Sequence, residues 1–328
     1  MRLATDCACC TCVPGVSSLL PRSPHKSFIP WTIRPAQAII AATMPDASAS
    51  LPPAAVLERA DGAVRLALGQ RDGRTRIETL YQRAPARVLF PDAPTDQPAQ
   101  AVLINTAGGI AGGDRIAIEI QAGAGTVATA TTQAAEKVYR ALDAPARLDT
   151  RIAVADGAWF EWLPQETILF DGARLDRRLA FDLAPAARLL AAETVLFGRA
   201  ARGEQMRHGQ LLDSWAVRRD GHLVWADRLR LTGDIRAQLD RPFGFAGAVG
   251  LTTLLHAGPE AASFLPRARE IAATEPAEGA ATLVNGILLI RFLDRDGARL
   301  RESAASAAMT LRHEIAGLSP TPPRVWRS

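Results

Sequence analysis

The stretch that decides the fold reads Ala107-Gly108-Gly109-Ile110-Ala111-Gly112-Gly113-Asp114, and Arg-Ile-Ala-Ile-Glu-Ile follows at residues 115–120. Paired glycines permit positive φ and close backbone approach, which suits either a phosphate cradle or a sharp turn into a strand. A nucleotide-binding P-loop ends in Gly-Lys-Ser/Thr, whereas the acidic Asp114 ends this loop and would repel a phosphate. The isoleucines that follow alternate with smaller or charged residues, which is the pattern of a half-buried strand. The loop therefore predicts β structure and disfavours nucleotide binding.

The rest of the chain indicates a mainly β fold. Six Asp-Gly pairs, which favour tight hairpin turns, are spread between residues 61 and 297. Alternating or short apolar runs predict strands at 64–68, 101–104, 115–121, 126–131, 148–154, 158–163, 167–170, 178–183, 188–192, 214–218, 223–231 and 287–292. Strands and helices do not alternate, which argues against a doubly wound α/β sheet. We expect one large sandwich-like or helical-β domain.

Helical periodicity is confined largely to the C-terminal part. It predicts α-helices at 260–274 and 298–316, and a further short helix is plausible at 133–140. The apolar face of the last helix would consist of Leu300, Ala304, Ala307, Leu311 and Ile315. Three prolines between 320 and 323 disfavour regular structure beyond it. We expect an N-terminal extension at 1–43, a single β-rich domain at 44–318 and a C-terminal tail at 319–328.

The N-terminal extension holds every cysteine of the chain, namely Cys7, Cys9, Cys10 and Cys12. A folded body without cysteines suits a reducing compartment. The cluster could bind a soft metal through thiolates. Its Pro-, Ser- and Ala-rich surroundings lack strand or helix periodicity, however, which favours a disordered extension or one mis-assigned upstream of an initiator at Met44. Prolines also interrupt any apolar core, so the segment does not resemble a secretory signal.

Charge and motifs narrow the class of function. The whole chain carries a formal net charge of +4, and residues 1–43 contribute +3 of it. A nearly neutral body without a basic, aromatic-rich run indicates no nucleic-acid binding. Every apolar run is shorter than the roughly 18 residues that span a bilayer, so no membrane association is expected.

The histidines do not form a motif for catalysis or metal binding. They are scattered at His25, His208, His222, His256 and His313. They lack the i, i+4 pairing of a helical zinc site, although His208 and His222 could approach each other across a hairpin. The chain has no Gly-x-Ser-x-Gly elbow. We expect a protein that is not an enzyme and has no tightly bound cofactor.

Four motifs in one order carry a resemblance to a known family. They are Gly-Gly-Ile-Ala-Gly-Gly-Asp at 108–114, Thr-Thr-Gln-Ala-Ala-x-Lys-Val-Tyr-Arg at 131–140, Glu-Trp-Leu-Pro-Gln-Glu-Thr-Ile-Leu-Phe-Asp-Gly-Ala at 161–173, and Gly-Arg-x-x-x-Gly-Glu at 198–204. Together they resemble urease accessory proteins of the UreD (UreH) type, from about Leu66 to about Phe292. One departure is that Thr106-Ala107 stands where many members have Pro-Pro.

The resemblance implies a cytoplasmic factor for urease maturation. It implies that the chain helps to insert nickel into apo-urease, that it binds the urease apoprotein and accessory protein F directly, and that it reaches accessory protein G through F. The GTPase chemistry would reside in protein G. The implied fold is mainly β with two packed helices.

Acidic residues within apolar segments are the candidates for contact with nickel in transit. A buried carboxylate must be paired, hydrated or bound to a metal, and Ni²⁺ accepts oxygen ligands weak enough to release it. The candidate lining of a hydrated conduit comprises Asp114, Thr131, Thr132, Glu161, Glu166, Asp171, Glu193 and Glu204, with Glu166 and Asp171 foremost. If Trp162, Ile168 and Phe170 face the core, Glu166 shares their face unless Pro164 resets the register.

Other interpretations stay open. Glu166 could form a buried ion pair with Arg140, Arg174 or Arg199, or lie exposed at the Pro164 turn. The protein could be a pure adaptor without a metal path, or a degenerate phosphate-binding enzyme that uses the Gly-Gly loop.

A last group of residues is expected to shape the motif loops. Arg199 and Glu204 would form a charge-assisted pair that closes a loop between two strands, with Gly198 and Gly203 at its turns. Lys137, Tyr139 and Arg140 would fix the Thr-Thr segment against the loop of Gly108, Gly109, Gly112 and Gly113.

Overall fold

The computed structural model describes residues 58–92, 94 and 96–327. The expectations for residues 1–43, including the cysteine cluster and the initiator at Met44, lie outside the described residues. The boundaries at residues 43 and 318 stay predictions.

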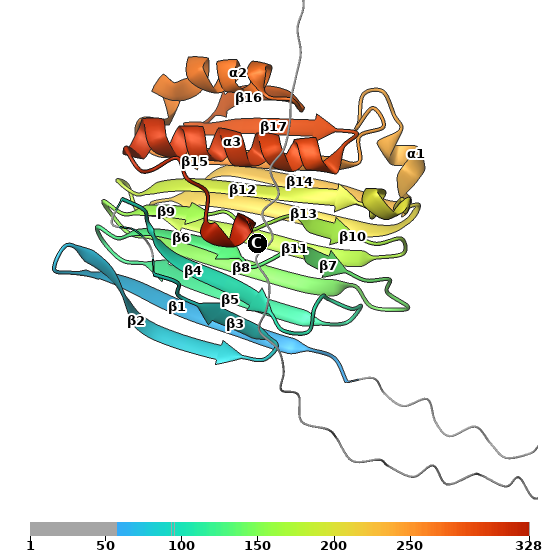
Figure 1. Cartoon of the computed structure of the whole chain (residues 1–328), viewed down its shortest axis with the longest axis horizontal. Helices are drawn as coiled ribbons and strands as arrows, with labels where there is room; N and C mark the ends of the chain where they lie inside the picture. The colour runs from blue at the N-terminus through green and yellow to red at the C-terminus, as the bar shows by residue number, and fades with distance from the viewer. Residues whose placement is uncertain (1–57, 93, 95, 328) are drawn as a thin grey trace, which may run out of the picture. The chain divides into compact units, whose positions relative to one another are not determined.

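The described residues form two packed β-sheets (Figure 1). Sheet A has seven strands in the spatial order β14 (His222–Asp234), β13 (His208–Arg219), β11 (Arg174–Leu183), β8 (Ala146–Val154), β5 (Arg115–Ala122), β1 (Asp61–Arg71) and β2 (Arg74–Arg83). Sheet B runs β16 (Glu278–Val284), β17 (Ile287–Asp294), β15 (Gly250–Ala257), β12 (Arg188–Phe197), β9 (Trp159–Trp162), β6 (Val127–Thr132), β4 (Ala99–Asn105) and β3 (Ala86–Leu89). Two short strands, β10 (Thr167–Leu169) and β7 (Glu136–Val138), extend sheet B beside β12.

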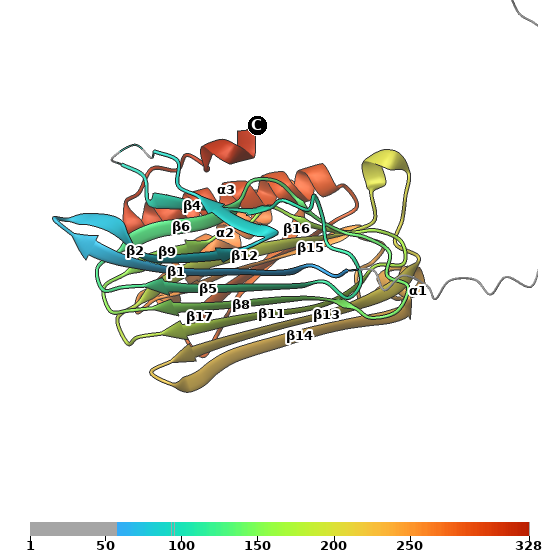
Figure 2. The same cartoon turned by 90° about the horizontal axis from the view of Figure 1, so that it is seen from below.

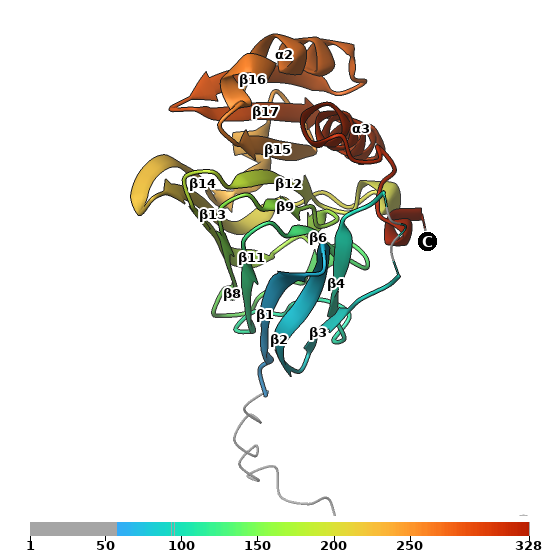
Figure 3. The same ribbon diagram turned by 90° about the vertical axis from the view of Figure 1, so that its left-hand side faces the viewer.

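The chain winds from one sheet to the other. From β4 to β13, apart from short β7 and β10, successive strands alternate between sheet B and sheet A. Within each sheet these strands are parallel neighbours, as in the pairs β5 with β8 and β6 with β9. Parallel neighbours therefore need no helical crossover, because the return strand lies in the opposite sheet. Figure 2 shows the strands of sheet A side by side, and Figure 3 shows the layers along the strand direction.

Helices cover part of the outer face of sheet B. α2 (Leu265–Thr274) packs on β16 and β17, and α3 (Gly297–Ala316) packs on β12, β15 and β17 (Figure 3). A second apolar core lies beneath them, separate from the main core between the sheets. The remaining helices are short: α1 (Ile235–Leu239), and the 3₁₀ turns η1 (Ala200–Arg202), η2 (Ala261–Phe264) and η3 (Arg324–Arg327). None of the helices in the described part of the chain is long and apolar enough to cross a membrane.

The mainly β fold with two C-terminal α-helices is confirmed, and each predicted strand stretch overlaps an observed strand. The structure corrects three local expectations. Residues 133–140 contain strand β7, not a helix, because β7 pairs with β10. Thr167 and Leu169 are buried, whereas Ile168 and Phe170 are only half-buried, so the register does change after Pro164. The C-terminal prolines do not prevent regular structure, because η3 forms and the Trp326 indole donates a 2.8 Å hydrogen bond to the Thr131 hydroxyl.

Candidate functional site

The four sequence motifs meet at one end of the sandwich. Strands β4, β6, β9 and β12 are parallel, so their carboxyl ends lie at the same edge of sheet B. The segments that leave this edge for sheet A are 106–114, 133–145, 163–173 and 198–207. These segments hold most of the motif residues. The end where they meet, at the side of β7 and β10 in Figure 1, is the motif end of the molecule.

The Gly-Gly loop is fixed by backbone contacts at this end. The Asp114 carboxylate accepts the N–H groups of Ala60 at 2.9 Å and Ala111 at 2.7 Å. Tyr139 donates its hydroxyl to the carbonyl of Gly108 at 3.0 Å. A Cβ atom on Gly109 would lie 2.4 Å from the Tyr139 ring. Close packing against Tyr139 therefore requires a glycine at position 109. The Asp114 carboxylate holds the turn through its two backbone hydrogen bonds.

Lys137 and Arg140 support the same region. The Ile110 N–H donates to the Lys137 carbonyl at 2.7 Å. Arg140 forms a β-bridge with Ala173, and its side chain fills the space where a Cβ on Gly172 would lie. On Gly112, a Cβ would lie 2.6 Å from the Cβ of Ala141. The second motif segment thus packs directly on the first.

Glu161 lies on the helix side of sheet B and is fully buried. Its carboxylate forms an ion pair with Arg312 of α3 and accepts from Trp159 Nε1 at 2.8 Å and from the Thr129 hydroxyl. Glu166 lies 3.7 Å from Arg301 of the same helix. The expected ion-pair partners were wrong, because neither carboxylate pairs with Arg140, Arg174 or Arg199.

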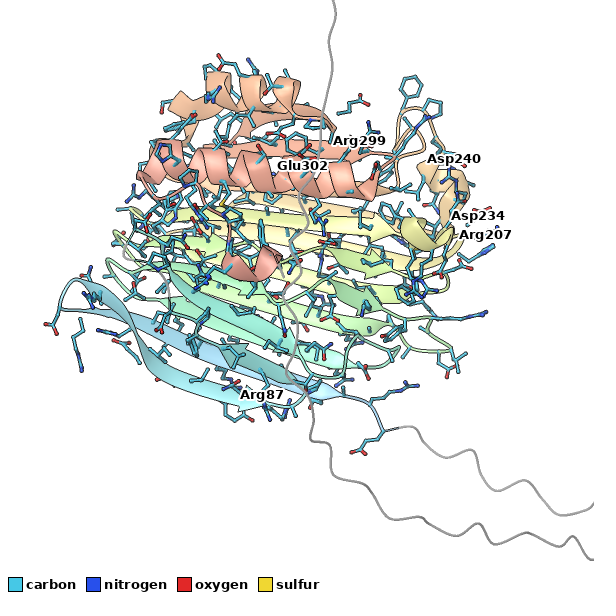
Figure 4. All side chains as sticks on the ribbon, viewed as in Figure 1. Arg87, Arg207, Asp234, Asp240, Arg299 and Glu302 are labelled. Carbon is cyan, nitrogen blue, oxygen red and sulfur yellow. The ribbon has the colours of Figure 1, made fainter. Side chains whose placement is uncertain are left out.

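Asp171 and Glu204 belong to the outer loops of the motif end. Asp171 accepts the backbone N–H groups of Arg207 at 2.7 Å and His208 at 3.0 Å. Although burial acts in the opposite direction, these bonds lower the pKa of Asp171. Arg199 donates its Nε to Glu204 at 2.8 Å, and this contact lowers the pKa of Glu204. Figure 4 labels Arg207 near Asp234 and Asp240 of the α1 corner.

Two glycines form the turns of the loop at residues 198–204. Gly198 has φ 101°, and a Cβ there would lie 2.5 Å from the Glu204 carbonyl oxygen. Gly203 ends η1 in the left-handed region. The Arg199–Glu204 pair therefore closes a loop between β12 and β13.

A cavity of about 150 Å³ lies between the sheets at the motif end. Ile116, Ile118 and Leu148 of sheet A form part of its wall, facing Leu103 and Trp162 of sheet B. Arg87, labelled in Figure 4, joins the lining from β3. Its oxygen- and amide-bearing lining includes Asn105, Thr132, Gln165, Thr167, Glu136 and Glu193.

Glu136 is a second perturbed carboxylate on the cavity lining, beside Glu193. Its oxygens accept from the Asn105 amide at 3.2 and 3.3 Å. Desolvation by burial raises the pKa of Glu136 to about 7, against the ordinary 4.5, although the Asn105 bond opposes the shift. Glu136 therefore exchanges its proton near neutral pH.

Glu193 joins the cavity to a buried charge cluster. Arg177, which spans the interior, pairs with Glu193 of sheet B and with Asp213 of sheet A, donating Nε to Asp213 at 2.9 Å. The Trp162 indole also donates to Glu193 at 2.8 Å. Burial raises the pKa of Glu193, and Arg177 only partly offsets the effect. Although burial acts against it, Asp213 and Glu193 raise the pKa of Arg177, so one cation faces two acids.

Only part of the sequence-derived lining reaches the cavity. Thr132 and Glu193 line it, whereas Asp114, Glu161, Glu166, Asp171 and Glu204 do not. Thr131 is buried and receives the Trp326 indole. His208 and His222 lie at opposite ends of the β13–β14 hairpin, so the expected approach was wrong. In the described part of the chain, no three His, Cys, Asp or Glu side chains are grouped to hold a metal ion.

Glu136 was missed because it occupies the variable position of the second motif. Its neighbours there are small and polar, and sequence periodicity gives no sign that Asn105, far away in the chain, shares its pocket. An available signal was Asn105 itself, a polar residue that ends the apolar run 101–104 just before the Gly-Gly loop.

These features define a mainly β protein of two packed sheets with a carboxylate-bearing cavity between them. The sequence model of the UreD urease accessory protein family matches residues 60–327, and the chain belongs to this family. It is 46% identical over 270 residues to the urease accessory protein UreD of Magnetococcus marinus, covering 81% of this chain and 93% of that protein. It is 43% identical over 270 residues to the UreD of Azorhizobium caulinodans, covering 82% and 97%.

Proposed function

We propose that this protein serves in the cytoplasm as a scaffold for nickel insertion into apo-urease. It joins the urease apoprotein to accessory protein F and, through F, to accessory protein G. Family membership and the names of its relatives support a role in urease maturation. The GTPase chemistry would reside in protein G, as family membership implies. In this chain the Gly-Gly loop is packed against Tyr139 and ends in Asp114, which disfavours a phosphate site.

The second part of the proposal is that Ni²⁺ passes through the interior cavity. The observation that carries it is that two carboxylates, those of Glu136 and Glu193, line the same cavity between the sheets. Carboxylate, amide and hydroxyl oxygens bind Ni²⁺ without the strong retention of a closed thiolate or imidazole set. A passing ion needs such weak, successive ligands.

The charge balance of the interior favours a cation. Arg177 carries one positive charge between Glu193 and Asp213. Glu136 adds a carboxyl group whose pKa of about 7 lets it lose its proton when a cation arrives and regain it afterwards. The cavity is large enough for a few water molecules, so the ion need not shed its whole hydration shell.

The test is Glu136→Gln, which keeps the shape and the Asn105 contact but removes the charge. Urease matured with this variant should contain several-fold less nickel, while urease, F and G co-purify with it normally. Glu119→Gln is the matched control, because Glu119 lies on the exposed outer face of β5. Normal nickel loading with Glu136→Gln would remove the cavity from the path.

A pure adaptor is the nearer alternative. The complete pairing of Glu161 with Arg312 shows that a buried carboxylate in this fold can have a purely structural contact set. An adaptor would bind urease and F yet tolerate neutral substitution of every cavity acid. The combined Glu136→Gln and Glu193→Gln protein, assembled normally but with wild-type nickel transfer, would establish the adaptor. Binding of a labelled nucleotide to the isolated protein would favour the phosphate-binding alternative instead.

A further inference from the structure

A groove of about 650 Å³ crosses the outer face of sheet A. Its floor is a row of alanines, Ala180, Ala216 and Ala226, which are register partners on β11, β13 and β14. Arg151 of β8 is the next partner in the row and closes one end. In Figure 3 the β13–β14 side of sheet A curves away from the sandwich.

Two rows of larger side chains form the walls. One wall consists of the register partners Arg178, Ser214 and Arg228, and the other of Asp182, Arg218 and Leu223. The two walls lie four residues apart along β11 and β13, which is about 13 Å, and five residues apart along β14, where the register shifts. Neighbouring strands are about 4.8 Å apart. Between the walls there is room for one extended chain of about four or five residues, lying across the strands.

The charges of the groove favour an acidic occupant. Arg178 pairs with Asp176 at 3.0 Å and Arg218 lies 3.9 Å from Asp182. Arg151 and Arg228 are exposed and have no ion-pair partner among the residues that the structure describes, although Arg228 donates to the Ser214 hydroxyl at 3.2 Å. An adjoining hollow of about 430 Å³ adds the exposed Arg230.

The acids of the groove do not cancel this excess. Asp227 is held by Arg291 of β17, and Arg178 is held by Asp176. The remaining lining has the acids Asp149 and Asp182 against the three arginines Arg151, Arg218 and Arg228. The chain outside residues 1–43 is nearly neutral overall, so the arginines here are a local concentration. Guanidinium groups on both walls match the alternating side chains of an extended acidic peptide.

We propose that this groove docks an extended acidic segment of a protein partner, with small residues against the alanine floor and carboxylates against Arg151, Arg178 and Arg228. A single-stranded nucleic acid is the less suitable occupant, because the described lining exposes no aromatic ring for base stacking. The docking site lies on the opposite side of sheet A from the interior cavity and does not depend on the nickel path.

The probe is a fluorescein-labelled peptide in which small and acidic residues alternate, Gly-Asp-Ser-Glu-Gly-Asp-Ser-Glu, measured by fluorescence anisotropy with the full chain. Saturable binding is expected, weakened about tenfold in Arg178→Ser/Arg228→Ser through loss of two charge-assisted contacts. Ala216→Leu should weaken binding similarly without any change of charge, because it fills the floor from the solvent side. Arg74→Ser/Arg76→Ser, an equal charge change on the exposed β2 at the other edge of sheet A, should bind as the wild type does.

Several outcomes would overturn the proposal. They are absence of saturable binding, equal weakening in the β2 control, and unchanged binding by Ala216→Leu. Tighter binding of a single-stranded oligonucleotide of equal charge, lost in the same groove variants, would assign the groove to nucleic acid and also reject it. Glu136→Gln should leave peptide affinity unchanged, so a failure of the nickel path and a failure of the groove are distinguishable.

Discussion

The carboxylates on the helix side of sheet B and those of the cavity between the sheets differ in the hydrogen-bond donors and cations around them. On the helix side, Glu161 meets one guanidinium, that of Arg312, and two further donors. In the interior, Glu193 and Asp213 share Arg177, and the half-buried Glu136 accepts from the Asn105 amide and the Lys137 backbone without a guanidinium beside it. Burial alone therefore does not mark a functional acid in this fold. The donors around each acid decide how far its charge is compensated and how strongly it holds its proton.

The largest expected effect comes from breaking the ion pair between Glu161 and Arg312 on the helix side of sheet B. Arg312→Met leaves Glu161 buried without its cation and should lower the free energy of unfolding by about 3–5 kcal/mol. Urea denaturation followed by circular dichroism measures the change. The combined Glu161→Gln/Arg312→Met protein removes the stranded charge and should recover at least half of the loss. A loss below about 1 kcal/mol in the single variant would show that the pair is not what balances this region.

The fold was largely readable from the sequence because its strands alternate apolar and polar residues. β5 and β11 show the pattern clearly, with every second side chain buried. β15 was missed because nearly all of its residues are buried, which erases alternation. β2 was missed for the opposite reason, since it is exposed on both faces.

The winding between sheets and the register at the motif end could not be read locally. The connecting segments differ in length, so no sequence repeat marks the winding. Of the six Asp-Gly pairs, those at Asp72 and Asp220 form hairpins between adjacent antiparallel strands. The pair at Asp296 begins α3, where the Asp296 side chain caps the helix. One dipeptide thus serves different turns, and long-range pairing selects among them.

The site was harder to predict than the fold. Acidity in an apolar segment correctly drew attention to Glu161 as a buried group, yet its partner Arg312 lies 151 residues away. Local sequence patterns do not indicate which residues so far apart in the chain come into contact. The same limitation hid Glu136 and Asn105, which share a cavity only because β4 ends at Asn105 beside the place where β7 begins at Glu136.

An intermediate effect is expected from the pH dependence of the interior. Because the folded protein holds the pKa of Glu136 at about 7 instead of 4.5, the folded state keeps its proton where the unfolded chain has lost it. The contribution of Glu136 to stability therefore falls as pH rises from about 4.5 through 7. Glu136→Gln should be as stable as the wild type near pH 5 and more stable by about 1–3 kcal/mol at pH 8, allowing for partial contact with water.

Denaturation curves at pH 5 and pH 8 test this expectation. Glu119→Gln makes the same chemical change on the exposed face of β5 and loses only the exposed ion pair with Arg65, so it should stay within about 1 kcal/mol of the wild type at both. A stability difference between Glu136→Gln and wild type that does not vary with pH would mean that the cavity does not hold the proton. The contrast with Glu161 would then rest on ion pairing alone.

The smallest expected effect concerns Asp171, which adds the outer loops of the motif end to the comparison of carboxylate surroundings. Its pKa is lowered, because burial is outweighed by the N–H groups of His208 and Arg207. Its contribution is thus present above the ordinary carboxyl pKa of 3.8 and is lost as pH falls. Asp171→Asn should cost about 0.5–1 kcal/mol from pH 7 down to about pH 4, and progressively less below about pH 4. In one buffer series, Asp171→Asn and Glu136→Gln should therefore diverge from the wild type in opposite directions as pH rises. If both diverged in the same direction, the donors around each acid would not be what sets its proton affinity.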